Sequence, residues 1–86
     1  MYYVVYVLEN AGNKTWYIGF TIDLKKRLEA HNSGRSSHTS KHKSWGLIYA
    51  ELYKNKFDAL GREKFLKSGA GHRFLKKQLF HHLNPK

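Results

Sequence analysis

The first twenty residues form two apolar runs separated by a polar interruption. The run YYVVYVL, residues 2–8, places β-branched and aromatic side chains at consecutive positions, so both faces of a strand there would be apolar. The run TWYIGF, residues 15–20, has the same character, and the turn-rich ENAGNK lies between them. We therefore predict an antiparallel hairpin with a loop of about six residues, and a first strand that is central in its sheet.

The pairing within this hairpin decides which side chains share a face. If Leu8 pairs with Thr15, Tyr6 lies opposite Tyr17, and opposed residues of an antiparallel pair lie on the same face. We therefore expect both tyrosine hydroxyls on one face of the sheet, whereas a slip of one residue would separate them.

Helical periodicity replaces this alternation in DLKKRLEAHN, residues 23–32. Thr21 or Asp23 can cap the N-terminus of a helix here, and the following NSG provides a stop. Two leucines and two polar residues recur at i, i+3, i+4 and i+7 and so share one helix face: Leu24, Arg27, Leu28 and His31. Because the leucines must meet the sheet, we expect the arginine and the histidine at the rim of the core.

The rest of the chain predicts one more strand and two helices. WGLIYAELY, residues 45–53, reads as a third strand, with Glu51 alternating outward; a helix is expected over 56–68, a break at the GAG of 69–71, and a last amphipathic helix over 72–83. The pattern predicts a single domain over residues 1–86, of the α/β (α+β) class. Its three-stranded antiparallel sheet would be flanked by helices, in the order strand, strand, helix, strand, helix, helix.

The net charge restricts the possible classes of function more than the chain length does. Sixteen Lys and Arg against six Asp and Glu give a net charge of +10, which favours an anionic partner such as a nucleic acid. The chain has no cysteine, which excludes a disulfide partner and fits a reducing compartment. The first ten residues resemble neither a signal peptide nor a membrane span, so we expect a cytoplasmic protein with no membrane partner.

One acidic residue falls among apolar positions of the helix expected over 56–68. With Glu63 as residue i, the apolar residues at i−4, i−3 and i+3 are Ala59, Leu60 and Leu66. A buried carboxylate is costly when isolated, so it should have a cation, a metal ion or a water-filled cleft beside it. The structural alternative is an ordinary ion pair with Arg62 or Lys67.

Taken in order, these residues resemble the GIY-YIG nuclease family. The resemblance rests on VVY at 4–6, YIG at 17–19 after ten intervening residues, the following DLKKRLEAHN and a downstream ALGREKFLK. The resemblance covers nearly the whole chain. The chain is similar in particular to small stand-alone bacterial members related to the nuclease domain of the excision-repair incision enzyme.

The resemblance implies hydrolysis of phosphodiester bonds in DNA with one divalent ion, Mg²⁺ or Mn²⁺, held by Glu63. In this family Tyr6 would match the tyrosine that activates the attacking water, and Tyr17 the second tyrosine, which orients the nucleophile or a phosphate oxygen. Arg27 would neutralise the scissile phosphate and His31 would support the tyrosine. Tyrosine is an awkward base because its pKa is about 10. We expect the positive charge of Arg27 and the metal ion to lower it.

This sequence departs from the family at two places. Val-Val-Tyr replaces the first triplet, and Phe20 follows the second triplet where the excision-repair enzyme has a lysine of a proposed proton relay. The alternative function is therefore a nucleic-acid-binding module of the same fold that cleaves weakly or not at all. A third reading is an RNA-associated structural protein, which explains the charge alone.

Four basic residues are expected to contact phosphates: Lys26, Arg35, Lys41 and Lys43. The last three lie in the basic loop expected over 32–44, whose alternative role is only to aid solubility. His38 and His42 there have a zinc-like spacing but no further ligands to complete a site. We expect DNA as the partner, selected by its structure or by weak sequence preference. The sequence leaves open RNA as a substrate, a targeting protein and the oligomeric state.

Overall fold

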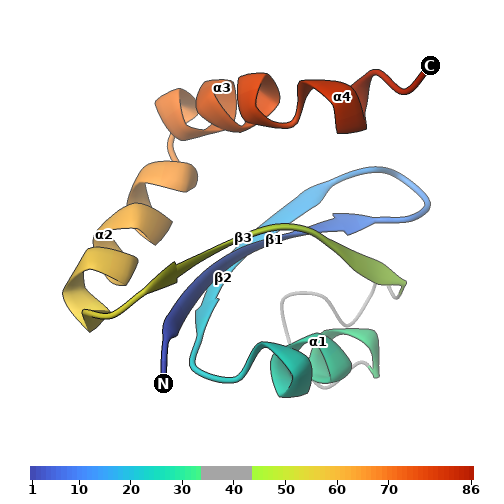
Figure 1. The fold of residues 1–86 in the computed structure, drawn as a ribbon. Helices are drawn as coiled ribbons and strands as arrows, with labels where there is room; N and C mark the ends of the chain where they lie inside the picture. Colours follow the sequence, from blue (N-terminus) through green and yellow to red (C-terminus); the bar gives the residue numbers. More distant parts are fainter. Residues whose placement is uncertain (34–43) are drawn as a thin grey trace.

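The computed structural model describes residues 1–33 and 44–86, and its elements follow the predicted order (Figure 1). The elements are β1 (Tyr3–Asn10), β2 (Trp16–Thr21), α1 (Leu24–Asn32), β3 (Trp45–Tyr53), α2 (Lys56–Leu66), α3 (Gly69–Gln78) and α4 (Phe80–Leu83). The α+β class and the three-stranded antiparallel sheet are confirmed. In Figure 1, α1 lies on one side of this sheet, and α3 and α4 lie on the other.

The central position of β1 is also confirmed, since the strand order is β2-β1-β3. Alternate side chains of β1 enter two separate cores. Val5 and Val7 pack with residues of α2 and α3, whereas Tyr6 and Leu8 pack with residues of α1. This double coverage explains why the strand is apolar at every position from Tyr3 to Leu8.

The pairing predicted for the hairpin is wrong by two residues. Leu8 pairs with Tyr17, and Tyr6 pairs with Gly19 instead of Tyr17. The cause lies in the loop, where the Asn10 side chain accepts hydrogen bonds from two backbone amides and Asn10 N donates to Thr15 O at 2.9 Å. Because a shift of two residues preserves the face, the two tyrosines still share it. Their ring centroids lie 6.3 Å apart.

Asp23 caps α1, as the sequence predicted, because its Oδ1 accepts from Lys26 N at 3.1 Å. The helix ends at Asn32, whose side chain bridges to the first residue of β3. Asn32 Nδ2 donates to Trp45 O at 2.9 Å and Trp45 N donates to Asn32 Oδ1 at 2.6 Å. These two hydrogen bonds join the end of α1, which precedes residues 34–43, to the start of β3, which follows them.

The predicted break at residues 69–71 is wrong. These residues form the first turn of α3, and the break falls one step earlier, where Ser68 caps that helix by accepting from Gly71 N at 3.1 Å. Gly71 is required here because a Cβ would collide with Phe65 O and lie 2.5 Å from Leu66 Cα. The last predicted helix is also interrupted, at Leu79, so that α4 is a separate short turn of helix.

Among the described residues, the helices are all too short or too polar to cross a membrane.

Candidate active site

A buried tyrosine hydroxyl joins β1 to α1. Tyr6 is 1% exposed, and its hydroxyl lies 2.9 Å from Nε2 of His31, which is fully buried on α1. Arg27, one turn earlier on the same helix, donates from Nε to the Tyr6 oxygen at 3.4 Å. With Nε2 of His31 accepting, the Tyr6 hydroxyl donates one hydrogen bond and accepts another, which satisfies a neutral phenol. The helical spacing of Arg27 and His31 therefore brings both of them to one oxygen atom.

Tyr17 completes this cluster from β2. Its ring centroid lies 4.8 Å from that of His31, with the two planes tilted by 58°. The structure thus brings together four of the five residues that the resemblance singled out. We refer to Tyr6, Tyr17, Arg27 and His31 as the Tyr–His–Arg cluster.

Gly19 gives the cluster its space. It pairs with Tyr6 across the hairpin, and a Cβ there would overlap the Tyr6 hydroxyl oxygen and lie 3.0 Å from Tyr17 Cε2. Only glycine leaves room for both rings at this position. The last letter of YIG is therefore explained by the packing of the two tyrosines.

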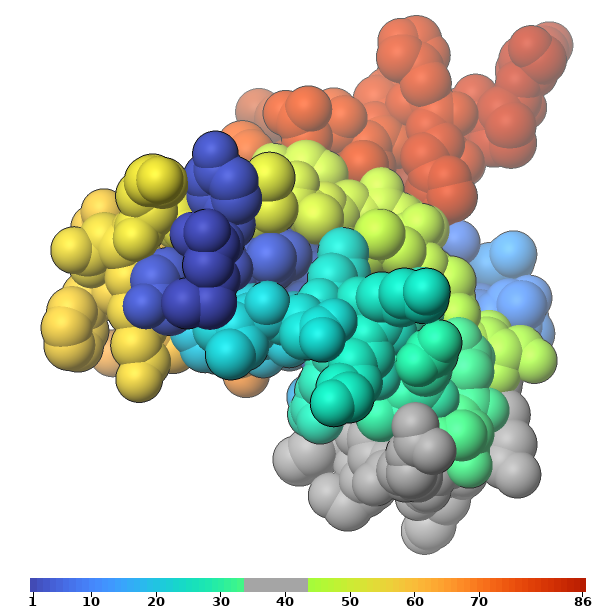
Figure 2. All heavy atoms as spheres, turned by 60° about the horizontal axis from the view of Figure 1, so that its bottom comes forward, coloured from blue at the N-terminus to red at the C-terminus, as the bar shows by residue number. Residues whose placement is uncertain are grey.

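Arg27 also borders an open hollow on the α1 side of the molecule. The hollow measures about 400 Å³ and is lined by Thr21, Asp23, Lys26, Arg27 and Ala30. In Figure 2 the α1 face is turned forward; the end of β2 lies beside α1, and the N-terminal residues and α2 lie farther to the left. The hydrogen bond to Tyr6 is the main cause of the raised pKa of Arg27, so the guanidinium remains charged. A phosphate in this hollow would therefore meet a fixed positive charge.

Arg27 lowers the pKa of Tyr6, as expected, but the net shift of this pKa in the protein alone is upward. Burial raises this pKa above its ordinary value, and the hydrogen bond and charge of Arg27 only partly oppose that effect. The charges of Tyr17 and Glu63 raise it further. Tyr6 is therefore a neutral phenol at physiological pH.

Glu63 belongs to a helix that packs on the opposite side of the sheet from α1. It lies on α2, whose Ala59 and Leu66 pack in the core with Val5 and Val7. Its carboxylate is near enough to the cluster for its charge to raise the pKa of Tyr6. Its ion pair is with Lys67, at 3.0 Å from Oε2 to Nζ, which is the structural alternative named above. An exposed i,i+4 pair of this kind contributes only about 0.3–0.5 kcal/mol, so Lys67 is easily displaced.

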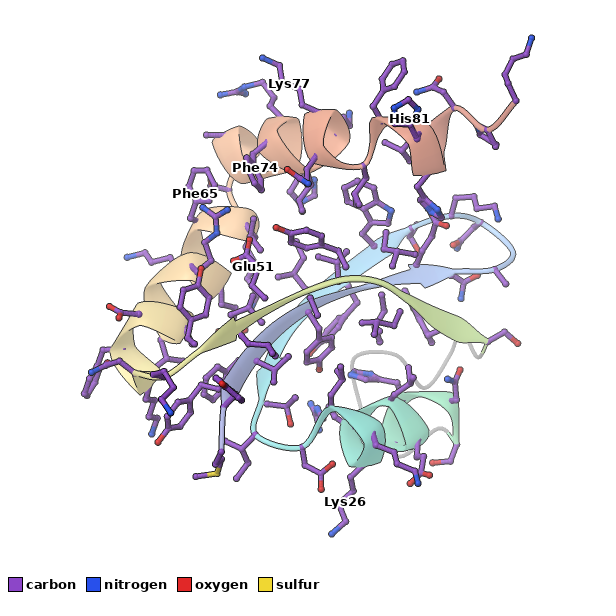
Figure 3. All side chains as sticks on the ribbon, viewed as in Figure 1. Lys26, Glu51, Phe65, Phe74, Lys77 and His81 are labelled. Carbon is purple, nitrogen blue, oxygen red and sulfur yellow. The ribbon has the colours of Figure 1, made fainter. Side chains whose placement is uncertain are left out.

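The expected phosphate-binding residues divide into two groups. Lys26 is exposed beside Arg27 and points away from the sheet below α1 (Figure 3). Arg35, Lys41 and Lys43 lie outside the described residues, as do His38 and His42. Phe20, at the position of the missing lysine, stacks on Tyr3 at 6.2 Å and belongs to the core on the α2 and α3 side. Position 20 therefore does not face the Tyr–His–Arg cluster.

The sequence analysis missed a second polar network that supports α2. Glu51 points inward, not outward, and accepts from Arg62 Nε at 2.9 Å and from the Tyr49 and Tyr53 hydroxyls at 2.5 and 2.7 Å. The Arg62 guanidinium lies 4.6 Å from the ring centroid of Phe74. Figure 3 shows Glu51 between the sheet and α3. Burial and the hydrogen bond to Glu51 raise the pKa of Tyr49 to about 12. The two tyrosines at i−2 and i+2 from Glu51 were the available sequence signal.

Comparisons with known proteins identify the family of this chain. The model of the GIY-YIG catalytic domain matches residues 2–76, and the chain belongs to this family of nucleases. The chain is 41% identical over 64 residues to the UPF0213 protein SpyM50708 of Streptococcus pyogenes serotype M5 (strain Manfredo), covering 73% of this chain and 68% of that protein. A second relative, the UPF0213 protein SpyM3_1077 of serotype M3 (strain ATCC BAA-595 / MGAS315), is 39% identical over the same length and coverage.

A solved structure supports the fold independently. The solution NMR structure of the UPF0213 protein BH0048 from Bacillus halodurans superimposes with a TM-score of 0.56 and 26% identity. The match covers 91% of this chain and 85% of that protein. The resemblance drawn from the two triplets and the downstream helix is thereby confirmed.

Proposed function

We propose that this protein is a divalent-metal-dependent endonuclease that hydrolyses phosphodiester bonds in DNA. Membership of a family whose nucleases act on DNA, generally with a divalent metal ion, supports the reaction class. The observation that carries the proposal is the Tyr6 hydroxyl held between His31 Nε2 and Arg27 Nε. A net charge of +10 supports an anionic polymer as the substrate.

The proton path in this proposal avoids a tyrosinate. The attacking water gives its proton to the Tyr6 oxygen while Tyr6 passes its own proton to His31 Nε2, so that no free phenolate forms. Histidine is the side chain most often used for general acid–base catalysis. The raised pKa of Tyr6 is then no obstacle, because the phenol acts as a relay.

Arg27 and Tyr17 act on the phosphate in this scheme. Negative charge grows on the phosphate oxygens as water attacks, and the Arg27 guanidinium at the edge of the 400 Å³ hollow offers fixed donors to them. Tyr17 orients the water or a phosphate oxygen. Because Arg27 keeps a hydrogen bond to Tyr6, a phosphate bound to Arg27 would be held at a fixed position relative to the Tyr6 hydroxyl.

Glu63 is the residue that would hold the metal ion. Mg²⁺ is commonly bound by one or two carboxylates, several waters and substrate phosphate oxygens. Glu63 is 19% exposed and is paired with the exposed Lys67, so its carboxylate suits this mode. When bound, the ion stabilises charge on the phosphate oxygens.

Binding to DNA in this proposal is mainly electrostatic. Lys26 lies beside Arg27 at the hollow, and we assign Arg35, Lys41 and Lys43 to contacts with the phosphate backbone. Phosphate contacts position a protein on DNA without reading sequence. We therefore expect selection by nucleic-acid structure or a weak sequence preference.

A second candidate function is a binding module that cleaves weakly or not at all. Tyr6 is 1% exposed and Glu63 is paired with Lys67, so neither group is arranged for reaction without a substrate. This module would bind nucleic acid through the same basic surface and would be indifferent to Mg²⁺.

A cleavage panel separates the two functions. The substrates are labelled single-stranded, duplex, flapped and branched DNA and RNA, with Mg²⁺, Mn²⁺ or a chelator. We compare the wild type with Glu63→Gln and with Glu29→Gln, an exposed carboxylate on α1 that serves as the matched control. Products that need metal, vanish in Glu63→Gln and persist in Glu29→Gln are expected. A folded wild type that binds DNA but cuts none of these substrates would leave only the binding module.

A further inference from the structure

A second cavity lies on the other side of the sheet from the Tyr–His–Arg cluster. It measures about 770 Å³ and opens between the end of the β1–β2 hairpin and the helices α3 and α4. Six of its lining residues carry chemistry: Glu9, Lys14, Trp16, His72, Lys76 and His82. We call it the hairpin–α3 cleft. Its size falls within the range of sites that bind small ligands.

Two aromatic rings form the walls of the cleft. The ring centroids of Trp16 and His72 lie 6.0 Å apart, with an angle of 43° between their planes. The indole is held in place because Trp16 Nε1 donates to Glu9 Oε2 at 3.1 Å. Aromatic side chains that line a cleft can stack on a planar ring such as a nucleobase.

Glu9 supplies the hydrogen-bond acceptors of the cleft. Its Oε1 lies 3.0 Å from His82 Nε2, and its side chain is only 12% exposed. Burial raises the pKa of Glu9, but hydrogen bonds from Trp16 and His82 outweigh it and leave the pKa below its ordinary value. A carboxylate accepts about four hydrogen bonds, and two are accounted for here. The remaining capacity matches donors such as the amino group of a base.

Two exposed lysines give the cleft its positive charge. Lys14 sits in the hairpin loop with φ +63, and its N–H donates to Asn10 O at 3.0 Å, so the turn is ordered despite this left-handed backbone. Lys76 lies on α3. Two ammonium groups against the single carboxylate of Glu9 leave a net attraction for a phosphate.

We propose that the hairpin–α3 cleft binds one nucleotide, with its base against Trp16 and His72 and its phosphate beside Lys14 and Lys76. This site goes beyond the proposed nuclease function, since it lies on the opposite face of the sheet and requires no cleavage. Part of it also lies outside the family match, which ends at residue 76, whereas His82 comes from α4. The nucleotide is either free or part of a strand, and the same chemistry recognises both.

The test is a titration of the full chain with deoxynucleoside monophosphates, with deoxyribose 5-phosphate lacking a base, and with a four-nucleotide DNA. Calorimetry and tryptophan fluorescence report binding. The cleft variant Lys14→Glu/Lys76→Glu is compared with Lys64→Glu/Lys77→Glu, which makes the same charge change on exposed residues outside the cleft. Figure 3 shows Lys77 on the outer side of α3, away from the sheet. Thermal melts check that each variant is folded.

We expect a nucleotide to bind with fluorescence quenching, and its affinity to fall at least tenfold in the cleft variant but less than twofold in the matched variant. His72→Ala should weaken binding about tenfold through lost stacking. Binding of monophosphates identifies a free-nucleotide site, and binding of the four-nucleotide DNA alone identifies a strand site; both support the proposal. Equal losses in the two lysine variants, equal binding of the base-free sugar phosphate, or no binding at all would overturn it. Glu63→Gln should bind as the wild type does, so loss of nuclease activity and loss of this site are distinguishable.

Discussion

The hydroxyl of Tyr6 is the atom on which the local chemistry of this protein depends. It is buried, it lies against His31 and Arg27, and its ring occupies the space left by the missing side chain of Gly19. A tyrosine in this setting is fixed in one orientation by packing and by two hydrogen bonds. The same contacts that position it for proton transfer also contribute to folding.

The packing at Gly19 gives a prediction at the residue scale. Gly19→Ala places a methyl group against the Tyr6 hydroxyl and the Tyr17 ring, so one of them must move. Overpacking of this kind costs about 1–3 kcal/mol of the free energy of unfolding. Urea unfolding followed by circular dichroism measures this loss. Gly46→Ala on β3 is the matched control, because a Cβ there meets nothing within 4 Å, and a loss as large as that of Gly19→Ala would contradict the packing argument.

At the scale of elements, α2 is held on the sheet by its ion pair with β3. Arg62 binds Glu51 through Nε and Nη2, at 2.9 and 3.1 Å, and it directly precedes Glu63 in the chain. Fixing Arg62 therefore also restricts where the next residue can point. We expect loss of this network to lower the free energy of unfolding. We also expect it to lower activity, because the position of Glu63 would change.

The pKa of Glu51 predicts how this contact responds to acid. Burial raises that pKa, but hydrogen bonds from Arg62, Tyr49 and Tyr53 outweigh it and leave the pKa below its ordinary 4.5. The stabilisation is thus complete above about pH 4.5 and is lost as the pH falls through the lowered folded value. Glu51→Gln should unfold more easily at pH 7, by about 1–3 kcal/mol, and lose less further stability on acidification.

Urea unfolding of the wild type and Glu51→Gln between pH 7 and pH 3 measures both effects. Glu29→Gln, exposed on α1, should differ from the wild type by less than about 0.5 kcal/mol at pH 7. Equal acid sensitivity of the wild type and Glu51→Gln would show that Glu51 does not carry the predicted stabilisation.

How far the sequence predicts this site depends on the scale of the contact. The shared face of Tyr6 and Tyr17 was predictable because it depends only on the two-residue period of a strand, and the shared face of Arg27 and His31 follows from helical spacing. The pairing of Tyr6 with Gly19 was not predictable, because hydrogen bonds of the Asn10 side chain set it. Helical spacing placed Glu63 near the core but carried no information on which face of the sheet α2 would cover.

At the scale of the whole molecule, the sheet separates two surfaces. The α1 face carries the Tyr–His–Arg cluster beside an open hollow, and the α3 and α4 face carries the hairpin–α3 cleft. The principal extents are 34 × 31 × 21 Å, so both surfaces lie within reach of one nucleic-acid strand that passes around the edge of the protein. The charge of +10 would hold such a strand with a strong dependence on salt.

The most direct measurement of the central claim is the single-turnover cleavage rate of Tyr6→Phe. This change removes only the hydroxyl that links His31 and Arg27. Tyr3→Phe is the matched control, because it makes the same change on the other face of the sheet, where Tyr3 stacks on Phe20. Protein in excess over DNA, at low salt, ensures that binding does not limit the rate.

The account predicts that Tyr6→Phe remains folded, binds DNA as the wild type does and cleaves at least about 100-fold more slowly, the usual contribution of general acid–base catalysis. Tyr3→Phe should cleave at the wild-type rate. Cleavage by Tyr6→Phe at the rate of Tyr3→Phe would contradict the account, because the buried cluster would then be a packing feature with no part in the reaction.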